Sequence, residues 1–134
     1  MVNFCATKDY DVTFERGTRI GYADRAHHFI SGTASIDARG AVVHAGDVER
    51  QLGRALDNVA ALLRSGEAQL ENMTHFIVYL RDPSDHDRID ACLAERFPEI
   101  PRLLVQGAVC RPQWLVEVEG IAAVACEDPR LPAF

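Results

Sequence analysis

Several features that mark particular classes of protein are missing from this sequence. Its 134 residues contain no apolar run near the ~20 residues that a membrane-spanning helix requires. Basic residues are outnumbered, with 14 Lys and Arg against 20 Asp and Glu, so the formal net charge is −6. A protein whose main function is to bind nucleic acid needs a basic surface. We therefore expect neither a membrane nor a nucleic acid as a partner.

Metal-binding and phosphate-binding motifs are missing as well. The five histidines and four cysteines show no zinc-ligand spacing, and the cysteines include no Cys-x-x-Cys pair. The glycines are isolated turn residues and form no phosphate-binding loop. No basic segment followed by an apolar stretch opens the chain, which predicts reduced thiols and a cytoplasmic location. We expect no metal site.

The pattern of apolar residues indicates a single α+β domain over residues 1–134, with a core over about residues 12–125. Asp47 and the apolar spacing after it predict a helix that stops at Gly66, and a second helix is expected from Ser84 to Pro98. Strands are expected at 12–16, 19–22, 27–31, 73–80, 103–109 and 114–124. The order β-β-β-α-β-α-β-β predicts a mixed sheet with both helices on one face, and an apolar second face that an oligomer would cover.

Two glutamates and an arginine are the first candidates for a functional site. Glu117 and Glu119 are two residues apart in an expected strand, so they share a face about 7 Å from each other. A short turn joins their strand to the one that Arg102 opens, and a hairpin there would bring Arg102 level with residues near 120. An arginine so placed can bind a carboxylate with two hydrogen bonds. An ordinary solvated strand face also explains the two glutamates.

The stretch around Gly32 and the cysteine at position 110 are further candidates. Gly32 interrupts a β-rich run, which predicts a bend or the close approach of another group. Ser31 and Thr33 beside it can donate hydrogen bonds to a ligand, or alternatively bond across the strands. Cys110 ends a strand and has no histidine close in sequence, so it is either a small apolar filler or part of a site.

Several segments together resemble the YjgF/RidA superfamily, in order, over about residues 12–125. They are FISGTASID, DNVAALL, FIVYLRD and, most specific of all, PRLLVQGAVCRPQWLVEVEGIAAV. The last segment combines an arginine that opens a strand, a turn with proline and a Glu-x-Glu strand, here Arg102, Pro112, Glu117 and Glu119. The resemblance implies a chorismate-mutase-like protomer that assembles as a homotrimer with clefts between subunits.

The resemblance also implies an activity and a set of site residues. Members of this superfamily hydrolyse reactive enamines or imines, such as 2-aminoacrylate, to a 2-keto acid and ammonia without a cofactor. Their carboxylate-binding arginine corresponds to Arg102, and their water-handling glutamate corresponds to Glu117. Their ligand-binding serine corresponds to Ser31, followed here by Gly32 and Thr33. The implied partners are therefore a small carboxylate-bearing metabolite and two further copies of the chain.

The chain departs from the deaminating members at three places. It has Gly17 and Thr18 where those proteins usually carry a tyrosine. Leu104, which we place among the substrate-binding residues, stands where a small residue or cysteine is common. Asp90 stands where an asparagine is common in the second helix. These differences bear on the 2-aminoacrylate activity and leave the carboxylate-binding arginine intact.

A second resemblance is to the C-terminal half of chorismatases, which hydrolyse chorismate. The segments that carry it are SGTASI, HAGDV, YLRDP and VCRPQWLVEVEG. Chorismatases use a cysteine and a glutamate seven residues apart, which correspond to Cys110 and Glu117, but they are about twice as long as this chain. We identify the chain as a stand-alone member of the chorismatase-like branch.

Two alternatives to a deaminase stay open, a chorismatase-like hydrolase and a non-catalytic trimer that binds a keto acid or aromatic acid. RNA cleavage, which older family labels suggest, is disfavoured by the net negative charge.

Overall fold

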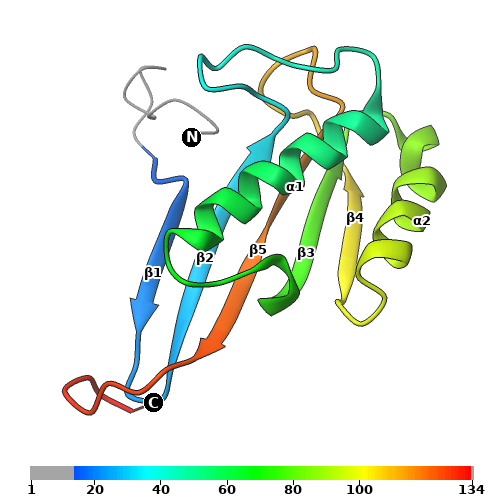
Figure 1. Ribbon diagram of the computed structural model, residues 1–134. Coiled ribbons are helices and arrows are strands. Elements are labelled where there is room, and N and C mark those ends of the chain that lie inside the picture. The colour runs from blue at the N-terminus through cyan, green and yellow to red at the C-terminus, as the bar shows by residue number, and fades with distance from the viewer. Residues whose placement is uncertain (1–13, 134) are drawn as a thin grey trace.

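The computed structural model describes residues 14–133, and these residues form a five-stranded sheet with two α-helices (Figure 1). The strands are β1 (Gly17–Gly21), β2 (Arg25–Ala34), β3 (Met73–Leu80), β4 (Arg102–Gln106) and β5 (Val116–Ala125). The helices are α1 (Val48–Arg64) and α2 (His86–Arg96), with short 3-10 turns η2 (Leu70–Asn72) and η3 (Pro83–Asp85) ahead of β3 and α2. The strand expected at 12–16 is not a strand at 14–16, and positions 12 and 13 lie outside the described residues.

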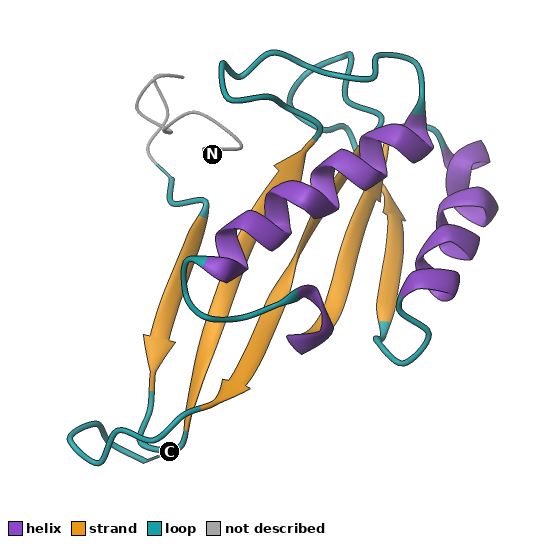
Figure 2. Ribbon diagram, in the orientation of Figure 1, coloured by secondary structure: helices purple, strands orange, loops and turns teal. Residues whose placement is uncertain are grey.

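The strands lie in the order β1-β2-β5-β3-β4, and the sheet is mixed. Neighbouring strands are antiparallel except β3 and β4, which run parallel with α2 as their crossover. Both helices lie on the same face of the sheet (Figure 2). The expected fold class, a mixed sheet with two helices on one face, is therefore confirmed.

One expected pairing is wrong, because β4 and β5 do not form a hairpin. Strand β5 lies in the middle of the sheet between β2 and β3, while β4 lies at the edge beside β3. The register places Arg102 opposite Phe76, and Phe76 opposite Gly120. Arg102 is thus level with residue 120, as the turn suggested, but a whole strand separates the two.

Helix α1 forms where the apolar spacing predicts it. The side chain of Asp47 accepts a hydrogen bond from the backbone N–H of Arg50, which satisfies one of the free donors at the helix start. Leu52, Leu56 and Leu63 are almost fully buried against the sheet. Burying each such side chain contributes roughly 1.5–3 kcal/mol. This stripe therefore fixes α1 across β2 and β5.

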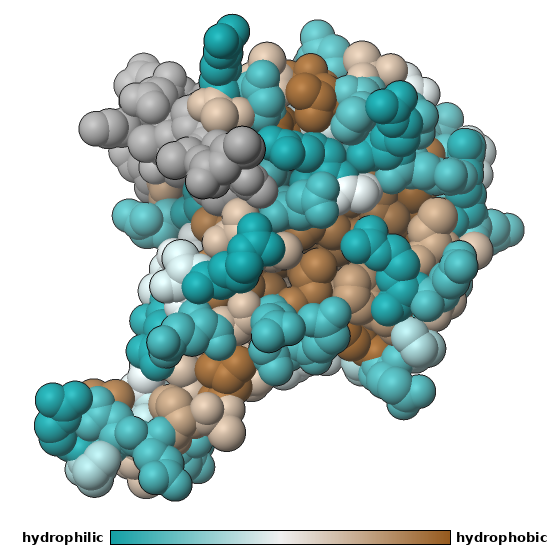
Figure 3. Space-filling view, viewed as in Figure 1, coloured by the Kyte–Doolittle hydropathy of each residue, from teal (hydrophilic) through white to brown (hydrophobic). Residues whose placement is uncertain are grey.

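Helix α2 covers the other side of the same face. Ile89 and Leu93 are fully buried, and the ring of Phe97 packs on Phe76 with 5.3 Å between centroids. The carboxylate of Asp82 caps the turn that leads into this helix, by accepting a hydrogen bond from the N–H of Ser84. On the helix side, hydrophobic side chains show between the two helices within a largely hydrophilic surface (Figure 3).

The two faces of β5 differ in chemistry. Val116 and Val118 are fully buried under the helices, as expected from their alternation. Glu117 and Glu119 therefore face the opposite way, onto the sheet face that neither α1 nor α2 covers. That open face also carries the large exposed hydrophobics Phe29, Ile20 and Leu103. Among residues 14–133, no helix is both long and apolar enough to cross a bilayer.

Candidate functional site

A cavity of about 340 Å³ lies at the end of the sheet where β2 ends and β5 begins. Glu117 lines it from the first residues of β5. Gly32, Ala34 and Ile36 line it from the end of β2 and the chain that follows. The loop between β4 and β5 contributes Cys110, Arg111 and Trp114, and the segment before β1 contributes Phe14 and Arg16. Three of the expected site residues, Glu117, Gly32 and Cys110, are therefore brought together.

Glu117 has the environment of a proton-transfer group. Its Oε2 atom is buried and has no hydrogen-bond partner among residues 14–133. Burial of the carboxyl raises the pKa of Glu117 above its ordinary value, and the nearby charge of Glu119 raises it further. A carboxyl group with a raised pKa can hold a proton at a pH where a solvated glutamate has lost it. Glu117 is therefore better suited than a solvated glutamate to act as both acid and base.

Gly32 provides the space for the Glu117 side chain. A Cβ atom at position 32 would overlap the Glu117 carboxylate. The pairing of β2 with β5 shifts register between Ile30 and Thr33, so the strand is irregular at this glycine. The close approach expected from the sequence is thus present, and the approaching group is the candidate catalytic carboxylate.

Glu119 is on the same face as Glu117, but its carboxylate accepts a hydrogen bond from a side chain of β3. The hydroxyl of Tyr79, from β3, donates a hydrogen bond of 2.8 Å to Oε1 of Glu119. This bond raises the pKa of Tyr79, since the phenol proton is held by an anionic acceptor. Glu119 is thereby fixed beside Glu117, where its charge acts on the Glu117 carboxyl.

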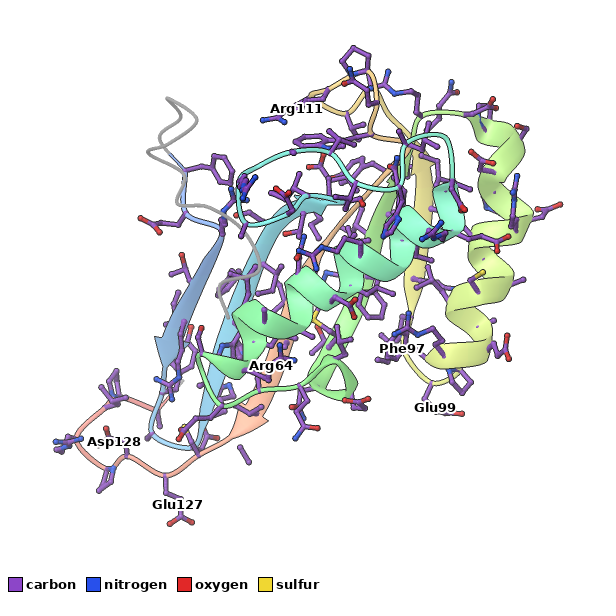
Figure 4. The ribbon with its side chains drawn as sticks, turned by 45° about the horizontal axis from the view of Figure 1, so that its top comes forward. Arg64, Phe97, Glu99, Arg111, Glu127 and Asp128 are labelled. Atoms are coloured by element: carbon purple, nitrogen blue, oxygen red, sulfur yellow. The ribbon has the colours of Figure 1, made fainter. Side chains whose placement is uncertain are left out.

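The loop between β4 and β5 contributes the Arg111 guanidinium and the Trp114 indole to the cavity. Arg111 donates from Nη1 to the carbonyl oxygen of Gly40 at 2.7 Å, and its guanidinium lies 5.1 Å from the ring centroid of Trp114. Figure 4 shows Arg111 at this end of the molecule, where the loop meets the segment after β2. Cys110 is exposed and is a free thiol. The sequence leaves the direction of the Arg111 side chain open, and in the structure this side chain lines the cavity.

Arg102 lies elsewhere, which corrects the expectation that it shares a region of one chain with Glu117. Arg102 pairs with Phe76 in the neighbouring strand, so the two side chains lie on the same face of the sheet, the one that the helices cover. There the Nε atom of Arg102 pairs with the carboxylate of Asp90 in α2 at 2.6 Å. Leu104 is on that face too and packs against the hydrophobic core. Arg102 and Glu117 therefore lie on opposite faces of the sheet, with β3 between their strands.

The two hydroxyl candidates make bonds inside the chain. The Oγ atom of Ser31 donates to the carbonyl oxygen of Glu15 at 2.6 Å. Thr33 is buried and donates to the carbonyl oxygen of Ser31 at 2.8 Å. Of the segment 31–33, only Gly32 lines the cavity.

Sequence reasoning missed several residues of the cavity. Trp114 follows Cys110 and Arg111 in the same loop, and an aromatic three residues after an arginine was the signal that could have marked it. Phe14 and Arg16 carry no such signal, because only the fold brings the start of β1 beside the end of β2. Within residues 14–133, no group of three or more His, Cys, Asp and Glu side chains is arranged to hold a metal ion.

Comparisons with known proteins agree with this architecture. A family model described as endoribonuclease L-PSP matches residues 21–124. The 3-aminoacrylate deaminase RutC of Acinetobacter baylyi is 32% identical over 98 residues, covering 72% of this chain and 78% of that protein. A chorismatase crystal structure matches with a TM-score of 0.74 and 32% identity over 82% of this chain, which spans only 36% of the chorismatase. RidA from the Antarctic bacterium Psychrobacter sp. matches with a TM-score of 0.75 and 21% identity, covering 92% of this chain and 94% of that one. The chain therefore belongs to the endoribonuclease L-PSP family, within the YjgF/RidA superfamily.

Proposed function

We propose that this protein is a cofactor-independent deaminase that hydrolyses a reactive 2-imino or 2-enamino acid to a 2-keto acid and ammonia. The observation that carries the proposal is the Glu117 carboxyl, which lines a cavity, is partly buried and has a raised pKa. The likeness to a 3-aminoacrylate deaminase over 72% of the chain supports the same class of reaction.

Glu117 supplies the proton transfers of this reaction. An enamine first takes a proton on its β-carbon and becomes an iminium ion. Water then adds to the iminium carbon as it loses a proton to the Glu117 carboxylate. The resulting carbinolamine releases ammonia once its nitrogen is protonated, and the carbonyl of the keto acid forms. Each step needs a group that both gives and takes a proton, and the raised pKa of Glu117 favours this role.

The carboxylate of the substrate is bound by Arg102 of a neighbouring subunit in this proposal. Arg102 uses its Nε for the bond to Asp90, and its two terminal nitrogens have no hydrogen-bond partner among residues 14–133. The open sheet face bears exposed Phe29 and Leu103, and monomers rarely leave such apolar area uncovered. A homotrimer that covers this face would bring the Arg102 side of one subunit to the Glu117 side of the next.

The test of the proposal is ammonia release from imines that an amino-acid oxidase generates in situ. We expect the protein to accelerate release, and both Arg102→Ala and Glu117→Gln to remove the acceleration. Loss of a desolvated arginine from a charge pair costs about 2–4 kcal/mol of ligand binding. No acceleration with any imine in the panel would reject the deaminase.

A second candidate, a chorismatase-like hydrolase or binder of an aromatic acid, is favoured by one specific observation. Cys110 and Glu117, seven residues apart, both line the cavity, together with Trp114. The 32% identity to a chorismatase supports the same alternative, although this chain spans 36% of that protein. Turnover of chorismate without any effect on imines would establish this candidate in place of the deaminase. Binding of benzoate without turnover of either substrate would indicate a sensor.

A further inference from the structure

The loop from 107 to 115 carries three residues of the cavity and belongs to no helix or strand. Such a loop needs bonds from the rest of the fold to keep Cys110, Arg111 and Trp114 in place. One side chain supplies three of them. It is Arg81, the residue that directly follows β3.

Arg81 reaches three backbone carbonyl groups of this loop. Its Nε donates to the carbonyl oxygen of Trp114 at 2.8 Å. Its Nη2 donates to the carbonyl oxygens of Val109 and Arg111, each at 2.8 Å. The backbone N–H of Arg81 also donates to the carbonyl oxygen of Leu115 at 3.0 Å. A single residue therefore ties both sides of the turn to the end of β3.

No other side chain of the described part of the protein bonds to the carbonyl groups of Val109 and Arg111. The buried Gln51 of α1 secures only the end of the loop, through the carbonyl of Gln113 and the N–H of Leu115. Arg81 also makes no ion pair within residues 14–133, so its guanidinium is directed at the loop alone. A planar guanidinium can serve several acceptors in fixed directions, which a lysine ammonium cannot reproduce.

We infer that Arg81 is a positioning residue for the cavity, which holds Cys110, Arg111 and Trp114 against Glu117 without touching the ligand. The inference rests on the proposed function only in taking this cavity as the place where the ligand binds. Its structural part, the immobilisation of the loop, can be tested without any turnover.

The experiment compares Arg81→Lys with a matched control, Arg64→Lys. Arg64 is exposed near the end of α1 that lies farthest from the cavity (Figure 4). The protein has one tryptophan, Trp114, so the anisotropy decay of its fluorescence and its quenching by acrylamide report on this loop alone. We expect Arg81→Lys to give a mobile, more readily quenched Trp114 and to weaken pyruvate binding, measured by calorimetry, about tenfold. Arg64→Lys should match the wild type in every readout.

Arg81→Gln serves as a second variant, because its amide can keep part of the bonding and should give an intermediate quenching. The inference is wrong if Arg81→Lys folds and leaves Trp114 as rigid and as shielded as in the wild type, even if the melting temperature falls. It is also wrong if neither variant folds, since Arg81 would then be a residue of general structure. Failure of the wild type to bind pyruvate would count against the proposed function, while the fluorescence comparison would still decide the role of Arg81.

Discussion

Glu117 and Glu119 are the same residue type on the same face of one strand, yet their surroundings give them different roles. Glu119 accepts a hydrogen bond from Tyr79, whereas the buried Oε2 of Glu117 has no hydrogen-bond partner in the described part of the chain. Burial makes the Glu117 carboxylate less stable as an anion, and the charge of Glu119 adds to this, which is why the pKa of Glu117 is raised. This difference in surroundings is why the proposed reaction assigns proton transfer to Glu117 and not to Glu119.

Replacing Glu117 by Gln should abolish activity and alter how stability depends on pH. General acid–base groups contribute about 10²–10⁴-fold to a rate, so we expect a loss of at least 100-fold. Because the folded-state pKa lies above the unfolded value, the protonated carboxyl favours the fold below that unfolded value. This contribution is lost as the pH rises through the folded pKa.

The measurement is urea unfolding of the wild type and Glu117→Gln at pH 4.5 and pH 7.5. We expect the variant to gain stability relative to the wild type as the pH rises. Glu119→Gln, which removes the charge that adds to the shift, should lower the pKa of Glu117 and shrink this effect. A stability difference that is equal at both pH values would contradict the account.

Gly32 should tolerate no side chain, because the Glu117 carboxylate occupies the space of its Cβ. We expect Gly32→Ala to displace Glu117, lower activity at least tenfold and cost about 1–3 kcal/mol of stability through overpacking. Activity assays and urea unfolding measure the two effects. Wild-type activity in Gly32→Ala would show that Glu117 does not need its present position.

Some individual residues of the site could be predicted from the sequence. Alternation placed Glu117 and Glu119 on one face, and the break at Gly32 indicated a close approach. Neither pattern distinguishes the two glutamates, because burial and the bond from Tyr79 depend on strands that are far apart in the chain. The contributions of Phe14 and Arg16 to the cavity were hidden for the same reason.

Helices and strands were predicted accurately where the capping residues and the apolar pattern of a segment agree with how that segment packs in the fold. Helix α1 carries a capping aspartate and a regular apolar stripe, and β3 covers the expected residues 73–80. The predicted pairing of β4 with β5 was wrong. A short connection favours a hairpin only when neither strand pairs better with other strands of the sheet. Here β5 buries one whole face between β2 and β3, and β4 is left at the edge.

Helix α1 contains one glycine whose replacement should stabilise the protein. A Cβ at Gly53 would meet no atom within 4 Å, and the residue lies inside the helix. We expect Gly53→Ala to add roughly 0.5–1 kcal/mol, because alanine loses less backbone entropy in a helix. A rise of about 2–5 °C in the melting temperature would agree with this estimate. A decrease would show that the surface around Gly53 is covered by another subunit or segment.

The whole molecule presents one face covered by helices and one face that is open and partly apolar. We expect the open face to form the interface of a homotrimer, as the proposed function requires. Phe29 is 38% exposed on that face, and an aspartate there would be buried in the trimer without a partner. Light scattering after size exclusion should therefore show smaller species for Phe29→Asp. Arg64→Asp, on the helix side, should leave the assembly intact, and an unchanged mass for Phe29→Asp would reject this interface.

The central claim is that Arg102 of one subunit and Glu117 of the next act on one substrate. The most direct test mixes Arg102→Ala and Glu117→Gln, each inactive alone, under conditions that let subunits exchange. In trimers formed at random from equal amounts, about a quarter of the sites contain both native residues, so we expect about a quarter of wild-type ammonia release. Mixed trimers that form, as native mass spectrometry would show, and yet release no ammonia above the background would contradict the claim.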